Sequence, residues 1–471
     1  MVFSSLLFLT VFLPITVALY FFADTKVKNY FLLIVSLIFY SYGEPKFVFV
    51  MLAEIIIDYI ISLYIDKTNI TKVKNTLLVC ALTINIAVLF VFKYLDFSIG
   101  ICNSVFGSEI GYKNIALPIG ISFFTFQSIS YVIDVYKGKV GAQKNPFFLA
   151  LYISFFPQLI AGPIVRYSTI EQQINNRETT IESFKAGITR FVVGLTKKIL
   201  LANNLSIVAE NIFGQNPTMV EPTVLWIGSL CYSLQIFFDF SGYSDMAIGL
   251  GKIFGFYFEE NFDYPYISKS VTEFWRRWHM SLGQWFRDYV YIPLGGSKVK
   301  ASRHIFNMFV VWALTGIWHG ANYTFIVWGM MYFVLLIIEK YIIKPWDLKN
   351  AFIKAAWFVF TLLTVNFGWV IFNSPSLGFA ETYILGMFAR YNRFDISNPQ
   401  IVYYFREYGC IILIAMVLST PIIKNLLFRL ENGGADWIYE FVKPVGLMLM
   451  LIVSISYLIM GQHNPFIYFN F

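Results

Sequence analysis

Apolar stretches of membrane-crossing length follow one another along almost the whole of this 471-residue chain. Only 13% of the residues are charged, whereas about a quarter are charged in an ordinary soluble domain. Lipid cannot hydrogen-bond the backbone, so a segment that crosses it must pair its own backbone groups, as a helix of roughly 20 residues does. The sequence therefore predicts an all-α, polytopic membrane protein and excludes a soluble globule.

The apolar stretches predict eleven or twelve transmembrane helices together with re-entrant segments. We expect residues 2–22 to be a retained first helix, because no basic residues precede the stretch and no small-residue cleavage site follows it. Residues 147–165 contain two prolines and a glycine, which predict a broken, re-entrant segment. Residues 183–213 either cross the membrane once or lie in its interface. The other expected spans are 29–42, 47–65, 76–97, 115–135, 223–250, 305–320, 322–343, 355–372, 408–424 and 443–460.

This succession of spans indicates a single membrane domain over residues 1–471. We divide it into N-terminal helices over 1–145, a core with re-entrant and interface segments over 146–343 and C-terminal helices over 344–471. The chain has a formal charge of +7, but it is too apolar to be a nucleic-acid-binding protein. Its composition therefore indicates the lipid bilayer as its partner.

The loops between the first spans differ in positive charge. Loops after the first, third and fifth spans hold eight lysines, and the alternate loops hold only Lys46 and Lys113. The positive-inside rule then places the N-terminus outside. We expect a multi-pass protein of the cytoplasmic membrane. The eight lysines are Lys26, Lys28, Lys67, Lys72, Lys74, Lys137, Lys139 and Lys144.

Several kinds of chemistry lack support in the sequence. The four cysteines are scattered without a C-x-x-C pair or a histidine at ligand spacing, so we expect neither a disulfide framework nor a metal site. A phosphate-binding G-x-x-x-x-G-K-[ST] loop and a G-x-S-x-G nucleophile motif are also missing. We expect no bound cofactor.

Residues 252–303 differ from the rest of the chain. They hold 13 charged and 14 aromatic residues among 52, and their eight cations predict a cytoplasmic segment that does not span lipid. Helical spacing would place Trp275, Trp278 and His279 on one face. These aromatic residues and the arginines beside them either anchor the segment at the interface or bind an anionic head group. The cations available for the second role are Arg276, Arg277, Arg287 and Lys298.

Residues 305–338 contain no charged residue, yet His319 lies near their middle. An imidazole in such a stretch indicates either a function or a satisfied hydrogen bond between helices. Gly316 and Gly320 flank the ring and favour function, because small residues let another backbone or a substrate approach. Histidine titrates near neutrality, so His319 is a candidate general base for acyl transfer.

Two pairs of acidic residues leave another class of protein open. Asp239 and Asp245 lie in one apolar stretch, and Glu54 and Asp58 share a helix face in another. Such carboxylates either serve an ion-coupled transporter or exporter, or cap broken helices and bind tyrosine hydroxyls. The second interpretation is favoured.

Seven segments of the chain resemble the membrane-bound O-acyltransferase (MBOAT) family, in particular its bacterial alginate, exopolysaccharide and peptidoglycan O-acetyltransferases. The segment GLTKKILLANNL at 194–205 departs slightly, with Thr196 where an aromatic residue is expected. The segments are MVFSSLLFLTVFLP at 1–14, LPIGISFFTFQSISYVIDVY at 117–136, FFPQLIAGPIVRY at 155–167, FDFSGYSDMAIGLGKIFGF at 238–256, NFDYPYISKSVTEFWRRWHMSLGQWFRDYVYIPLGG at 261–296, TGIWHGANYTFIVWG at 315–329 and the C-terminal NPFIYFNF.

The resemblance implies a ring of helices around a central tunnel, with His319 and His279 as the catalytic histidines. His304 and His463 match no catalytic position of the family, and we expect them to be ordinary loop and terminal residues. Asn322 is a candidate donor to the tetrahedral oxyanion. Family members take an acyl thioester from the cytoplasm and pass the acyl group across the membrane, usually to a separate extracytoplasmic protein, here expected to be an SGNH-type O-acetyltransferase or esterase-like partner.

The function that we predict is O-acetylation of an extracellular or cell-wall polysaccharide with acetyl-CoA as the donor. Trp275, Trp278, Arg276, Arg277, Arg287 and Lys298 are the expected donor-binding residues. Within the same family, a teichoic acid D-alanyl transferase is the alternative. From another class, the alternative is the ion-coupled transporter.

The charge asymmetry makes a prediction about topology. The N-terminus and residues 98–114 should face outside, and residues 66–75, 137–146 and 252–303 should face the cytoplasm. Single cysteines in these loops, in a background without the four native cysteines, report the side through an impermeant thiol reagent. Labelling of the 137–146 loop from outside intact cells would contradict the orientation.

Overall fold

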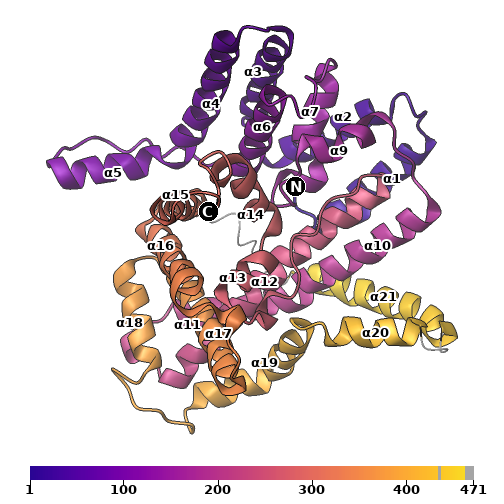
Figure 1. Cartoon of the computed structure of the whole chain (residues 1–471). Coiled ribbons are helices and arrows are strands. Elements are labelled where there is room, and N and C mark those ends of the chain that lie inside the picture. Colours follow the sequence, from indigo (N-terminus) through magenta and orange to yellow (C-terminus); the bar gives the residue numbers. More distant parts are fainter. Residues whose placement is uncertain (433–435, 462–471) are drawn as a thin grey trace. The chain divides into compact units, whose positions relative to one another are not determined.

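The computed structural model describes residues 1–432 and 436–461, and within them every regular element is a helix (Figure 1). This confirms the all-α, polytopic fold class. The chain forms two compact units, Met1–Phe191 with Ser244–Glu259 and Val192–Tyr243 with Glu260–Phe471. The ring, the tunnel and the single domain expected from the sequence stay predictions. His463 and the C-terminal NPFIYFNF motif lie outside the described residues.

Eight helices in the described part of the chain are long and apolar enough to cross a membrane. They include the stretch that the sequence left ambiguous, which forms one run of helix over Ile181–Phe213. The other seven are Val48–Lys67, Thr71–Lys93, Pro222–Ile253, Tyr323–Asp347, Ala351–Asn373, Pro399–Leu418 and Glu440–Ile459.

Four expected spans form helices that fall outside this set. The first stretch contains the shorter apolar helix Phe8–Phe22, and α2 (Lys28–Gly43) and α6 (Ile121–Tyr136) have 16 residues each. The stretch 305–320 forms α15 (Ala301–His319), whose first turn carries the polar Arg303 and His304. The helix expected to start at residue 408 starts earlier, at Pro399. The side chain of Asn398 caps this start, and proline is favoured in the first turn of a helix.

The first unit is built mainly from the N-terminal helices. Its central helices α3, α4 and α6 pack pairwise against one another. The helices are α1 (Leu13–Phe22), α2 (Lys28–Gly43), α3 (Val48–Lys67), α4 (Thr71–Lys93), α5 (Leu95–Phe106), α6 (Ile121–Tyr136), α7 (Pro146–Ser154), α8 (Phe156–Leu159), α9 (Tyr167–Asn175), most of α10 (Ile181–Thr196) and the end of α12 (Pro222–Ile253).

Two buried carboxylates of the first unit are paired with side chains of other helices. Asn85 on α4 donates to both carboxylate oxygens of Asp58 on α3, at 2.9 and 3.1 Å. Arg190 on α10 forms an ion pair with Asp245 on α12, with 2.6 Å between Nη2 and Oδ1. Two carboxylates considered for ion transport, Asp58 and Asp245, therefore have partners within the fold.

The segment expected to be re-entrant consists of the short helices α7 and α8, separated at Phe155.

The second unit contains the chemically distinctive segments. Its helices pack as neighbours in the pairs α13 with α16, α15 with α16, and α16 with α17. The helices are α11 (Asn203–Phe213), most of α12, α13 (Val271–Arg277), α14 (Met280–Phe286), α15 (Ala301–His319), α16 (Tyr323–Ile338), α17 (Ala351–Asn373), α18 (Leu377–Met387), α19 (Pro399–Leu418), α20 (Ile422–Asn432) and α21 (Asp436–Ile459).

A buried ion pair fixes the start of α11 against α12. A wide turn over Lys197–Ala202 precedes α11, and its Lys198 ammonium lies 2.6 Å from an Asp239 carboxylate oxygen. Both side chains are almost completely buried. Gly242 on α12 permits this approach, because a Cβ there would lie 2.8 Å from the carbonyl oxygen of Gly194. Asp239, a third carboxylate considered for ion transport, thus also has a partner.

Glycines allow α15 and α16 to pack closely. A Cβ on Gly316 would lie 2.6 Å from the carbonyl oxygen of Phe325, and one on Gly329 would lie 2.6 Å from that of Trp312. Backbone atoms cannot move aside as a flexible side chain does. Small residues at such contacts are a common way for membrane helices to associate.

We predict that Gly316→Ala destabilises the protein by about 1–3 kcal/mol, because the new methyl group overpacks the contact with α16. Thermal unfolding in detergent should show a lower Tm. The matched control is Gly446→Ala on α21, since a Cβ there meets nothing within 4 Å. Equal Tm values for Gly316→Ala and the unmodified protein would contradict the close packing.

Candidate active site

His319 is the last residue of α15, and its side chain is 7% exposed. Three aromatic rings surround the imidazole. Trp328 and Phe372 approach it edge to face with centroid distances of 5.0 and 5.1 Å, and Trp318 lies 4.9 Å away. The ring therefore lies in an apolar, enclosed environment, where water is scarce and electrostatic interactions are strong.

His279 lies at a break between two short helices. Helix α13 ends at Arg277, and His279 has the left-handed backbone angles φ +45° and ψ +53° before α14 begins. The prediction that Trp275, Trp278 and His279 share one helix face is wrong, because the helix does not continue to His279. A non-glycine residue in this conformation costs about 1–3 kcal/mol and is typical of functional sites.

Backbone hydrogen bonds hold this conformation in place. The N–H of Met280 donates to the carbonyl oxygen of Asn261 at 3.0 Å, and the N–H of Asp263 donates to that of Arg277 at 3.0 Å. Residues 261–263 thus fasten the chain on both sides of His279. The imidazole is 2% exposed and packs edge to face on Phe240, with 4.5 Å between the ring centroids.

Trp318 links the two histidines through ring contacts. Its ring centroid lies 6.1 Å from that of His279 and 4.9 Å from that of His319. The structure therefore brings both predicted catalytic histidines to one aromatic cluster in the second unit, although 40 positions separate them in the sequence.

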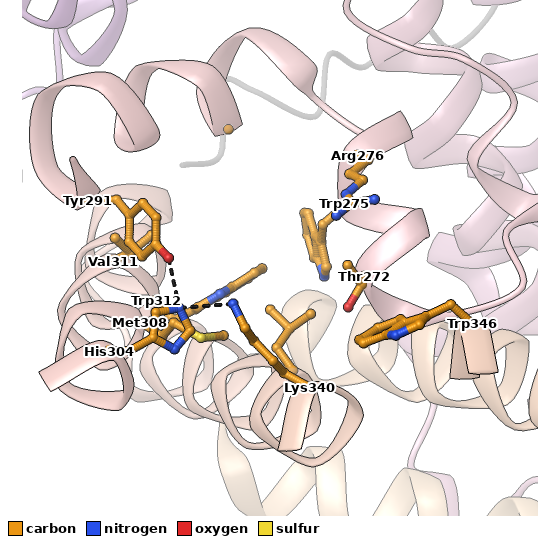
Figure 2. Close-up of a pocket in the computed structure, with 12 residues that line it drawn as sticks. Thr272, Trp275, Arg276, Tyr291, His304, Met308, Val311, Trp312, Lys340 and Trp346 are labelled. Carbon is orange, nitrogen blue, oxygen red and sulfur yellow. Dashed lines mark hydrogen bonds between the residues drawn. The ribbon is translucent and has the colours of Figure 1, made fainter. Parts of the chain in front are cut away.

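A separate pocket of about 690 Å³ opens beside α13. Figure 2 shows Trp275 and Arg276 on one side of it and His304 and Lys340 on another. Among the residues that the structure describes, no acidic side chain lines the pocket. Its lining residues are Thr272, Trp275, Arg276, Gly283, Tyr291, His304, Met308, Val311, Trp312, Leu336, Lys340 and Trp346.

Hydrogen bonds connect the polar groups of the pocket. His304 Nε2 lies 2.7 Å from the Tyr291 hydroxyl and 3.1 Å from Lys340 Nζ (Figure 2). Its Nδ1 lies 2.7 Å from the Tyr341 hydroxyl. Burial, and then the Lys340 ammonium, lowers the pKa of His304. The expectation that His304 is an ordinary loop residue is wrong, since it is a buried helical residue with three polar contacts.

Glu339 fixes helix α13 at the edge of this pocket. Its carboxylate accepts hydrogen bonds from the N–H groups of Val271 and Thr272, both at 2.7 Å, and from the Thr272 hydroxyl at 2.6 Å. The first N–H groups of a helix have no partner within it, so this carboxylate caps α13. It also accepts from Trp357 Nε1 at 3.2 Å. The capped helix carries Trp275 and Arg276 into the pocket.

A family model and a search for similar proteins both identify the family of this chain. The family model described as MBOAT, membrane-bound O-acyltransferase family, matches residues 60–378. A probable alginate O-acetylase of Pseudomonas putida is 38% identical over 491 residues, with all of both chains covered. The chain belongs to the MBOAT family. It is thus a multi-pass membrane O-acyltransferase.

Two further relatives differ in how much of the chain they match. A peptidoglycan O-acetyltransferase of Helicobacter pylori is 32% identical, covering 100% of this chain and 98% of its own length. A teichoic acid D-alanyltransferase of Bacillus subtilis is 30% identical, covering 55% of this chain and 68% of its own length. The similarity to O-acetyltransferases therefore extends through parts of the MBOAT chain that the D-alanyltransferase match does not reach.

The other predicted site residues separate into different environments. Trp278 is buried, with its ring 4.7 Å from that of Trp369. Arg277 binds the carboxylates of Asp263 and Glu273, at 2.8 and 3.0 Å, so it ties residues 261–263 to α13. Of the predicted aromatic and cationic set, only Trp275 and Arg276 line the pocket.

Three predicted residues lie away from the pocket lining. Arg287 forms an ion pair with Asp288 at 2.8 Å, and Lys298 is exposed. Asn322 caps α16 by accepting from the Thr324 N–H at 3.1 Å, and its amide donates to the carbonyl oxygen of Pro375 at 3.1 Å. The structure thus gives Asn322 a helix-capping role.

Proposed function

We propose that this MBOAT protein transfers acetyl groups from cytoplasmic acetyl-CoA across the membrane for the O-acetylation of an extracellular or cell-wall polysaccharide. The full-length similarity to alginate and peptidoglycan O-acetyltransferases supports the acetyl group and the polysaccharide. The observation that carries the proposal is the enclosed imidazole of His319, surrounded by Trp318, Trp328 and Phe372.

His319 supplies the base that such a reaction needs. A thioester is already activated, so the protein must bring a hydroxyl group to the acyl carbon, remove its proton and exclude water. In the proposed step His319 takes the hydroxyl proton while the oxygen forms a bond to the acyl carbon. The C–S bond then breaks, and the proton passes to the departing thiolate.

The pocket beside α13 is the proposed site for the phosphates and the adenine of the donor. Arg276 and Lys340 bring two positive charges, and the described chain pairs neither of them with a carboxylate. Trp275, Trp312 and Trp346 offer aromatic surfaces next to these charges. Phosphate oxygens and a planar base match such a combination of side chains.

The orientation and the partner follow from the same proposal. The eight lysines in alternate N-terminal loops support an N-terminus outside the cytoplasmic membrane, with residues 252–303 on the donor side. An SGNH-type extracytoplasmic protein then completes the transfer to the polysaccharide.

A D-alanyltransferase is disfavoured because that relative matches only 55% of this chain. A transporter is disfavoured because Lys198 and Arg190 form ion pairs with Asp239 and Asp245.

We expect His319→Ala to reduce acetyl transfer by about 10²- to 10⁴-fold, because the hydroxyl loses its base. Transfer is measured with purified protein in vesicles, radiolabelled acetyl-CoA, the extracytoplasmic partner and de-O-acetylated polysaccharide. An unchanged Tm confirms that the variant folds. A variant that keeps more than about a tenth of the wild-type rate would remove His319 from this role.

We expect Arg276→Gln and Lys340→Gln each to raise the KM for acetyl-CoA several-fold, up to about tenfold, because each loses one charged contact at a partly solvated site. The matched control is Lys298→Gln, which removes the same charge outside the pocket lining. With S-acetyl-N-acetylcysteamine, a donor without phosphates, the two pocket variants should behave like the wild type. Equal KM changes in Lys298→Gln would assign the effect to overall charge and not to the pocket.

A further inference from the structure

The imidazole of His279 is oriented by one amide side chain, that of Asn261. His279 Nδ1 lies 3.1 Å from Asn261 Oδ1. The same oxygen accepts from the backbone N–H of Ser281 at 3.2 Å and from the Ser281 hydroxyl at 2.9 Å. A backbone N–H only donates, so it identifies the Asn261 atom that it meets as the carbonyl oxygen. Because that oxygen cannot donate, Nδ1 must carry the hydrogen.

The other ring nitrogen is consequently a bare acceptor. A neutral imidazole with its hydrogen on Nδ1 presents a lone pair at Nε2. Burial lowers the pKa of His279 to about 3, which keeps the ring neutral. Its Nε2 is buried and has no hydrogen-bond partner among the described residues. The rings packed on His279 belong to Phe240, Phe262 and Trp318, and none of them is charged.

We propose that Asn261 is a positioning residue that holds His279 in the Nδ1–H tautomer, so that Nε2 accepts a hydrogen bond from an O–H or N–H group of the bound substrate. This inference rests on the proposed function and adds a residue to its site. A buried acceptor without a donor is costly, and a substrate group would satisfy it. The backbone carbonyl of Asn261 accepts from the Met280 N–H and so holds the left-handed turn at His279. One residue thus fixes both the ring and the chain that bears it.

Nitrogen NMR tests the tautomer without any turnover. The chain has four histidines, so protein labelled with ¹⁵N-histidine in vesicles gives few signals, and His279→Gln assigns those of His279. We expect a protonated Nδ1 and a bare Nε2 in the wild type. Asn261→Leu should populate the opposite tautomer, and Asn261→Asp, which keeps an oxygen acceptor, should not. A wild-type ring protonated at Nε2 overturns the proposal.

Ser281→Ala is the matched control for the local hydrogen bonds. It removes one donor to Asn261 Oδ1 without touching the imidazole, so the His279 tautomer should stay unchanged. If Ser281→Ala and Asn261→Leu change the His279 signals equally, a general loosening of the turn replaces the specific role of Asn261. An unchanged tautomer in folded Asn261→Leu overturns the proposal as well.

The substrate contact is tested by adding substrates to the labelled protein. A shift of the Nε2 signal on adding acetyl-CoA assigns the hydrogen bond to the acyl donor. A shift that also needs de-O-acetylated polysaccharide assigns it to the acceptor. If the Nε2 signal does not shift with both present, the proposed contact between His279 and the substrate is wrong. The proposed function itself is tested separately, by the measured transfer activity.

Kinetics separate positioning from a purely structural role. Asn261→Leu should lower kcat on the order of 10- to 100-fold, less than the loss of a whole catalytic group, and should leave the KM for acetyl-CoA unchanged. Asn261→Asp should recover most of the rate. Equal losses in the Leu and Asp variants, at equal Tm, would exclude the orienting oxygen as the cause.

Discussion

Every charged group that this chain carries into its interior needs a partner from another part of the chain, since lipid offers no water to replace one. Lys198 and Asp239 meet this need as an almost completely buried ion pair, and Arg190 and Asp245 meet it in the other unit. Leaving one member of such a pair alone would cost several kcal/mol, on the order of 3–5. These contacts therefore fix which helices lie together before any chemistry is considered.

The same requirement builds the candidate site. Glu339, the first charged residue after the uncharged stretch 305–338, finds its partners in the N–H groups at the start of α13. That contact orients Trp275 and Arg276 towards the pocket. At the other end of α13, Arg277 binds Asp263 and holds residues 261–263 beside His279. One short helix thus connects the pocket to the buried imidazole through polar contacts at both its ends.

Part of the site could be predicted from the sequence. His319 stood out because its stretch has no charge, and Arg276 because charge and aromatic rings concentrate around it. Lys340 was missed, although it directly follows Glu339 at the end of the apolar run. Asn261 gave no signal, because its role depends on a hydrogen bond to a residue 18 positions away. His304 was missed for the same reason, since its partners, Tyr291 on one side and Lys340 and Tyr341 on the other, come from two other segments of the chain.

The sequence by itself determined the multi-pass membrane class, the all-helical fold and the family, and it singled out His319 and His279 as candidates, because hydropathy and local motifs follow the order of residues along the chain. Only the tertiary structure decided that α13 ends before His279 and that Arg276, Lys340 and His304 share one pocket. It also decided that Arg277, Trp278 and Asn322 serve ion pairing, packing and capping, in that order. Such roles depend on which distant backbone and side-chain groups need a partner once water is excluded, and that need arises only when the helices have packed.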